Sequence, residues 1–138
     1  MEDKSDCVLC RIMEGTLPCL TIYEDENVKC IVSKEMEVYG HTLIIPKRHF
    51  ENIWNISSEQ LHYIADAIQH LSVLFKEKLG ATGINVLHAS GKDAGQSVCH
   101  FHVHVFPRFS GDGVDAWPHL PKKEFDKMDF VKRIISKD

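Results

Sequence analysis

The 138-residue sequence predicts an α+β fold built on an antiparallel sheet. Short segments with strand-like alternation lie on both sides of one long segment with helical periodicity. A turn sequence joins the first two short segments, as in a hairpin. Histidines at positions 100, 102 and 104 alternate with apolar residues, which is typical of a strand with one polar and one apolar face.

Length and composition indicate one globular domain, residues 1–138. The hydrophobic content is 43% and the charged content is 26%, which are ordinary values for a soluble protein. A net charge of -4 argues against a nucleic-acid partner. No apolar run is long enough to span a membrane, and five cysteines, an odd number, favour the reducing cytoplasm over a disulfide framework.

The N-terminal half is predicted to form a short helix and three strands. Asp6 is a suitable N-cap for the helix, and Gly15 a suitable stop. Residues 20–24 and 28–32 are the strands of the hairpin. Residues 41–46 form a third strand that is apolar on both faces and ends at a proline.

The longest periodic segment is predicted to be a helix that packs on the core. Ser57 and Gln60 have the spacing of a capping box, and Gly80 supplies the stop. The apolar stripe between them is Leu61, Ile64, Ala65, Ile68, Leu71, Phe75 and Leu79.

The C-terminal half carries two more strands and a final helical segment. Residues 84–89 are a fourth strand, a glycine-containing loop follows, and the histidine segment is the fifth. Trp117 and Pro118 either pack on the domain or seal a site or an interface. A helical segment is expected at residues 122–136.

The three alternating histidines predict a chemical role, because imidazole is costly to bury without a partner. Such a row can bind a metal, or it can supply a nucleophile and an acid or base. Four other histidines show no pattern: His62, His70, His88 and His119.

Two further motifs accompany this row. The loop that contains Gly95, Gln96 and Ser97 can cradle a phosphate with its backbone amides, although most such loops are only turns. Cys7 and Cys10 have the spacing of a zinc half-site, of a redox motif, or of chance. If they bind zinc, the candidate partners are His41, His49 and His100.

Together these blocks closely resemble the histidine triad family of nucleotide-binding proteins. The resemblance is carried by residues 100–107, His-Phe-His-Val-His-Val-Phe-Pro, with residues 95–98, residues 40–49 and the Cys7-x-x-Cys10 pair in the family's order. It extends over residues 7–117. It implies a five-stranded antiparallel sheet with one long helix and a short N-terminal helix, paired into a homodimer with a ten-stranded sheet.

The resemblance also implies nucleotidyl hydrolase or transferase chemistry at the α-phosphate of a purine nucleotide, either a nucleoside phosphoramidate or a dinucleotide. His102 matches the nucleophile that forms a nucleotidyl-histidine intermediate, and His104 matches the group that contacts phosphate and leaving group. Ser97 is the third residue expected to act in catalysis. The expected substrate contacts are His41, Gly95, Gln96, Ser97, Val98 and His104.

By the same resemblance, Cys7, Cys10, His49 and His100 would bind a structural zinc ion. The sequence departs from many relatives at Ser33 and Ala89, where they have an acidic residue and Asn or Gln, so ribose recognition does not carry over.

Two alternatives to nucleotidyl transfer through His102 remain from the sequence. One is a nucleotide-binding regulatory or scaffolding module with incidental catalysis. The other is a metalloenzyme whose three row histidines hold one catalytic metal.

Overall fold

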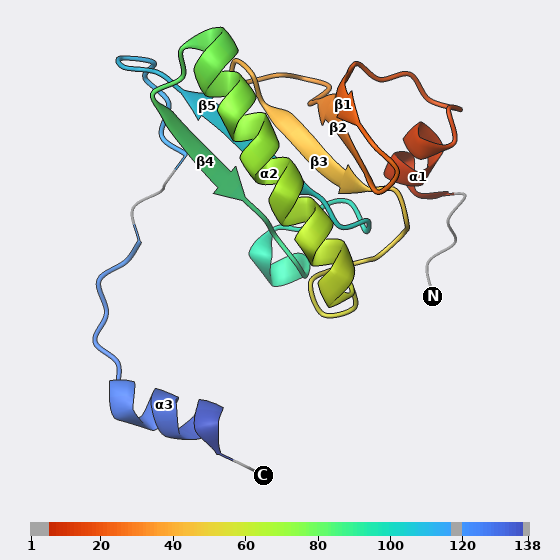
Figure 1. Cartoon of the computed structure of the whole chain (residues 1–138). Coiled ribbons are helices and arrows are strands. Elements are labelled where there is room, and N and C mark those ends of the chain that lie inside the picture. Colours follow the sequence, from red (N-terminus) through yellow and green to blue (C-terminus); the bar gives the residue numbers. More distant parts are fainter. Residues whose placement is uncertain (1–5, 117–119, 137–138) are drawn as a thin grey trace.

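The structure, a computed structural model, describes residues 6–116 and 120–136. It contains a five-stranded antiparallel sheet with the strand order β1-β2-β3-β5-β4 (Figure 1). The elements are α1 Val8–Met13, β1 Thr21–Glu24, β2 Val28–Val32, β3 Thr42–Pro46, α2 Ser58–Leu79, β4 Gly83–Leu87, the short 3-10 helix η2 Lys92–Ala94, β5 Val103–Arg108 and α3 Lys127–Ile135. The predicted α+β class and the antiparallel sheet are confirmed.

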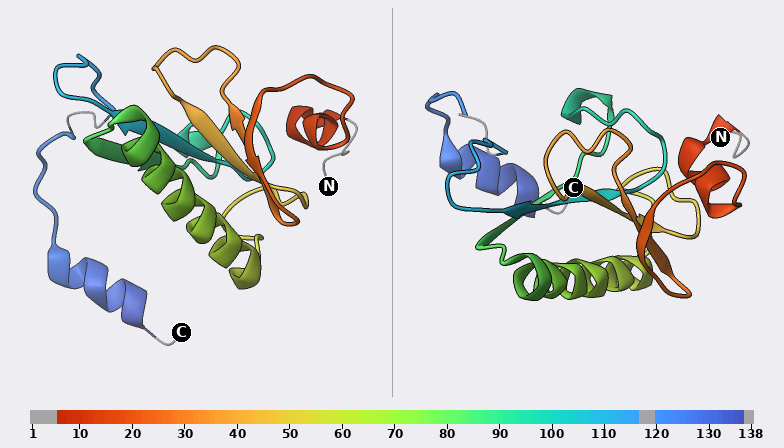
Figure 2. Two further views of the ribbon diagram at one scale, coloured as in Figure 1. Left: turned by 45° about the horizontal axis from the view of Figure 1, so that its top comes forward. Right: turned by 90° about the horizontal axis from the view of Figure 1, so that it is seen from above.

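Helix α2 covers one face of the sheet and encloses the main core (Figures 1 and 2). Phe101, Val103 and Val105 are buried in this core, at 4% exposure or less. They are the apolar residues between the histidines, so the predicted division into an apolar and a polar side holds. The histidines at alternate positions therefore belong to the opposite side, away from α2.

The N-cap and the stop of α2 form as the sequence predicts, but the capping box is only half formed, since Gln60 Oε1 is buried and accepts no hydrogen bond from the described residues. The buried stripe also differs in detail. The Ser57 side chain accepts a hydrogen bond from the Gln60 amide, and Gly80 ends the helix in the left-handed conformation. Ala67 is buried and Ala65 is exposed, because the helix turns position 67 toward the sheet. The stripe is therefore centred on Ile64, Ala67, Leu71 and Phe75.

Helix α1 packs with a second core cluster. Ile31 and Ile45 alternate with residues of the main core along β2 and β3, so this cluster lies on the other sheet face. The predicted N-cap, Asp6, is wrong. Cys7 is the cap: its carbonyl accepts the first helical hydrogen bond, from Arg11, and its Sγ accepts one from the Cys10 amide.

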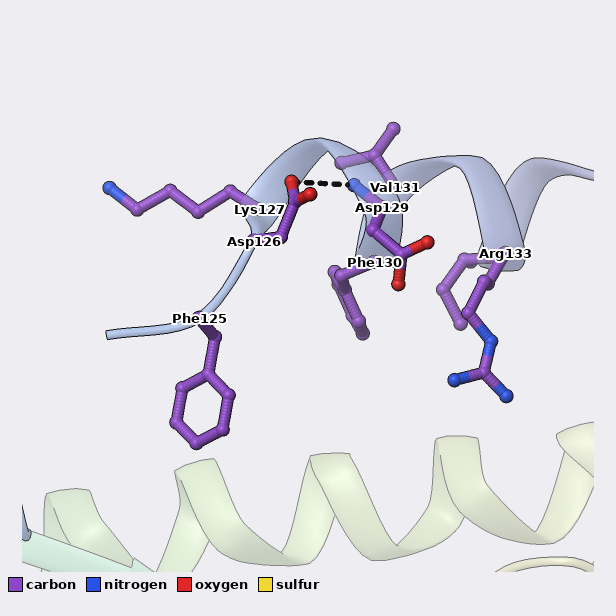
Figure 3. Close-up of a pocket in the computed structure, with 8 residues that line it drawn as sticks. Phe125, Asp126, Lys127, Asp129, Phe130, Val131 and Arg133 are labelled. Carbon is purple, nitrogen blue, oxygen red and sulfur yellow. Dashed lines mark hydrogen bonds between the residues drawn. The ribbon is translucent and has the colours of Figure 1, made fainter. Parts of the chain in front are cut away.

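The C-terminal helix stands apart from the sheet (Figure 1). α3 begins at Lys127 rather than at residue 122, and none of its residues is buried. Phe125 and Phe130 point from this segment toward α2 and help to line a hollow that contains no histidine (Figure 3). The predicted packing residues Trp117 and Pro118 lie outside the described residues. Within the described part of the chain, no helix is both long and apolar enough to cross a membrane.

Candidate active site and metal centre

The histidine row lies at the beginning of β5 rather than inside it. The strand begins at Val103, so His100 and His102 come just before it and His104 is its second residue. Sheet pairing with β3 reaches Val103 and stops there. Beyond Val103 the Pro46 carbonyl, at the end of β3, accepts a hydrogen bond from the His100 ring, and the Phe101 amide donates to the Phe50 carbonyl outside the ladder. The prediction of a strand through all three histidines is therefore corrected.

His100 belongs to a cluster of four metal-type side chains. Its Nδ1 lies 3.4 Å from Cys7 Sγ, 3.4 Å from Cys10 Sγ and 3.1 Å from His49 Nδ1. Cys10 Sγ lies 3.0 Å from His49 Nδ1. All four atoms lie within 4.8 Å of one another, and three of the four residues are buried. The structure thus brings together the four residues that the resemblance named.

This cluster fits a tetrahedral zinc ion. Zinc bound to two thiolates and two imidazoles separates its ligand atoms by roughly 3.3 to 3.8 Å. Four of the six separations here are 3.0 to 3.4 Å, and all six are within 4.8 Å. The other ring nitrogen of His100, Nε2, donates to the Pro46 carbonyl at 3.0 Å, the kind of second contact that fixes a metal-bound imidazole. Both nitrogens of His100 are therefore engaged away from His102 and His104, which does not fit one catalytic metal held by the whole row.

The ring of His102 is oriented by the backbone carbonyl of His100, two residues earlier. Its Nδ1 donates a hydrogen bond of 2.8 Å to the carbonyl of His100, since a carbonyl oxygen can only accept. In a neutral imidazole the second nitrogen, Nε2, then carries the lone pair. The predicted nucleophile is thus held in the tautomer that a nucleophile needs.

His41 and His104 form a second imidazole pair. His41 Nε2 lies 2.8 Å from His104 Nδ1, so one nitrogen donates to the other. The His41 ring also stacks on Phe106, with ring centroids 4.2 Å apart. The rings of His102 and His104 lie 5.0 Å apart in an edge-to-face arrangement. The three predicted site histidines 41, 102 and 104 are therefore neighbours.

Burial keeps these imidazoles neutral. It lowers the pKa of His104 to about 4, with the neighbouring histidines as further causes. It also lowers the pKa values of His41 and His102, although the His100 carbonyl opposes the shift at His102. A neutral imidazole is the form that can attack phosphorus or share a proton.

The loop before the row is held by the side chain of Gln96. Its Oε1 accepts from the Gly91 amide, and its Nε2 donates to the carbonyls of Glu51 and Val98. The predicted ligand contact of Gln96 can therefore come only from its backbone, since its side-chain amide is engaged within the loop. Gly95 is in the left-handed conformation, at φ 96°, and Ser97 is exposed.

Sequence reasoning missed two residues beside the row. His88 Nδ1 donates to the carbonyl of His102 at 2.8 Å, and His88 Nε2 lies 2.6 Å from Ser90 Oγ. The available signal was the position of a histidine and a serine just after a strand that pairs with the histidine segment. Ala89 lies between them and has no polar side chain, in line with the departure noted in the sequence.

The comparison with known families decides the family. The family model described as HIT domain matches residues 14–111, more than half of the chain. The chain belongs to the histidine triad family. The protein hit of Bacillus subtilis is 35% identical over 117 residues, which cover 84% of this chain and 81% of that protein.

Two other histidine triad relatives bear on the site. A crystal structure of a zinc-bound histidine triad family protein from Mycobacterium smegmatis has 36% identity and a TM-score of 0.78, and 83% of each chain is covered. An adenylylsulfatase from Arabidopsis thaliana is 33% identical, over 79% of this chain and 55% of that protein. Membership of the family supports a nucleotide hydrolase or transferase in general.

Proposed function

We propose that this histidine triad protein is a nucleotidyl hydrolase or transferase that forms a covalent intermediate on His102. The substrate would be a purine nucleotide bearing a leaving group on its α-phosphate, such as a nucleoside phosphoramidate or a dinucleotide. The observation that carries the proposal is the hydrogen bond from His102 Nδ1 to the His100 carbonyl, which leaves Nε2 as the basic nitrogen.

The proposed reaction has two steps. His102 Nε2 attacks the α-phosphorus, a nitrogen–phosphorus bond forms, and the bond from phosphorus to the leaving group breaks. The electron pair goes to the leaving group, which takes a proton. Water or another acceptor then attacks the same phosphorus, releases His102 and yields the nucleoside monophosphate or its transfer product.

His104 and the loop support this chemistry in the proposal. A neutral His104 whose Nδ1 accepts from His41 has its own proton on Nε2, where it can bond the phosphate or the leaving group. Ser97 and the Val98 amide are proposed as donors to the phosphate oxygens, whose charge grows in the transition state. The Gly95 backbone completes this loop.

We propose that Cys7, Cys10, His49 and His100 hold a structural zinc ion. Such an ion would supply a crosslink between α1, the chain after β3, and the histidine row. This site needs both cysteines in the reduced form. Because the cytoplasm keeps thiols reduced, we also propose that the protein is cytoplasmic.

The family resemblance further leads us to propose a homodimer joined along a sheet edge. β1 and β4 are the two edge strands, and Val86 on β4 is 42% exposed. Sedimentation analysis tests this: a dimer is expected, and a monomer at micromolar concentration would contradict it.

Turnover by a His102→Ala variant is the test of the proposed function. The substrate panel holds adenosine and guanosine phosphoramidates, dinucleoside polyphosphates and adenylyl sulfate. The variant should lose activity and keep nucleotide binding, and mass spectrometry of the wild type during turnover should find the nucleotidyl group on His102. His62→Ala, at an exposed histidine on α2, is the matched control. Binding without turnover by the wild type would favour the scaffolding alternative, and turnover by His102→Ala would refute the covalent mechanism.

A further inference from the structure

We propose that His88 is a positioning residue that holds the backbone of the nucleophile His102. This inference rests on the proposed function of His102. His88 lies just after the end of β4, and its Nδ1 donates to the carbonyl of His102 at 2.8 Å.

The need for such a residue follows from where the sheet stops. β5 pairs with β3 as far as Val103 and with β4 as far as His104. His102 therefore lies one residue before Val103, the first residue of β5 and the end of its pairing with β3. In a longer β4, a backbone amide would donate to the His102 carbonyl. Here the imidazole of His88 provides that donor instead.

The orientation of His88 is itself fixed. Ser90 Oγ accepts a hydrogen bond of 2.8 Å from the Ile53 amide, so its hydroxyl proton is available for His88 Nε2 at 2.6 Å. With Nε2 as acceptor, the neutral ring carries its proton on Nδ1, which is the nitrogen that faces the His102 carbonyl. The loop before α2, the end of β4 and the nucleophile are thus linked by one directed chain of hydrogen bonds.

His88 acts from the side of the sheet opposite the site. Its ring packs on Phe101, with ring centroids 4.4 Å apart, and Phe101 belongs to the core beneath α2. A substrate at His102 and His104 would lie on the other side, so His88 would not touch it. Its effect on the reaction would come through the placement of His102.

His102 is consequently held at two points. Its ring is fixed through Nδ1 by the His100 carbonyl, and its peptide is fixed through its own carbonyl by His88. Loss of the second contact lets the peptide after His102 tilt and moves the ring that attacks phosphorus. A displacement of about 1 Å at a reacting group can lower the rate by about 100-fold.

Three variants test the role of His88 in the zinc-loaded protein. His88→Leu keeps the apolar contact with Phe101 and removes the donor. His88→Asn restores a donor, because its Nδ2 is as many bonds from Cα as the histidine Nδ1. His62→Leu is the control for loss of an exposed histidine. We expect His88→Leu to lower kcat about 10- to 100-fold with KM nearly unchanged, and His88→Asn to recover most of the loss.

A second measurement does not need turnover. Nitrogen-15 NMR of the free protein reports which ring nitrogen of His102 carries the proton. We expect the Nδ1-protonated tautomer in the wild type and in His88→Asn, and a mixture of tautomers in His88→Leu.

The two measurements separate the failure of each hypothesis. A wild type that turns over no substrate would refute the proposed function, and the NMR comparison would still decide the role of His88. An unchanged His102 tautomer in His88→Leu would overturn the positioning role. So would a loss of kcat in His88→Leu that His88→Asn fails to recover, since that pattern indicates damage to packing.

Discussion

Gly40→Ala should destabilise the protein through a clash that the structure locates. Gly40 has a φ of 82°, and a Cβ atom there would lie 2.4 Å from Pro107 Cγ and 2.9 Å from Cδ. Pro107 is less than 2% exposed and its ring is rigid, so it cannot move aside. The left-handed backbone costs an alanine about 1–2 kcal/mol, and overpacking adds about 1–3 kcal/mol. We therefore expect a loss of roughly 2–5 kcal/mol in the free energy of unfolding.

Urea unfolding of Gly40→Ala and Gly80→Ala measures the two contributions separately. Gly80 also has a positive φ, 72°, and nothing lies within 4 Å of a Cβ atom there. It should lose only the backbone part, about 1–2 kcal/mol. Equal losses in the two variants would show that the contact between Gly40 and Pro107 is looser than described and would refute the reasoning.

Two further predictions concern the metal and pH. If the proposed zinc site is right, elemental analysis should find one zinc ion per chain in the wild type and none in Cys10→Ser, which should also have a lower Tm; a variant that keeps its zinc would contradict the proposed ligand set. Burial lowers the pKa of His104 from its ordinary 6.5 to about 4, so the unfolded chain binds this proton more tightly than the folded protein. Its contribution to stability is present above pH 6.5 and is lost as the pH falls toward 4. The urea midpoint should fall over that range, less so in His104→Gln; equal falls would exclude His104 as a cause.

The fold could be predicted because its signals are local. The Ser57 cap, the Gly80 stop and the proline at the end of β3 each depend on neighbours in the sequence, and each forms as expected. The errors arose where tertiary contacts decide. Cys7, and not Asp6, caps α1, because this helix start places both thiols beside His100. Ala67, and not Ala65, is buried, because the sheet lies on that side of α2.

The candidate site was predictable to a different degree in each part. Alternation alone indicated a functional histidine row, whereas the choice of His49 over His41 as a cluster member came from the family resemblance. The role of His88 was beyond sequence reasoning, because it depends on where the pairing of β4 and β5 ends. Alternation also could not show that the strand begins only at Val103.

The cysteine and histidine cluster also has a consequence for how the chain folds. Cys7 lies 93 positions from His100, Cys10 lies 39 from His49, and His49 lies 51 from His100. These residues meet only after most of the sheet has assembled, so the complete ligand set is absent from any local fragment of the chain. An ion at this cluster would stabilise the native state over every partly folded state in which one of the four ligands is out of place.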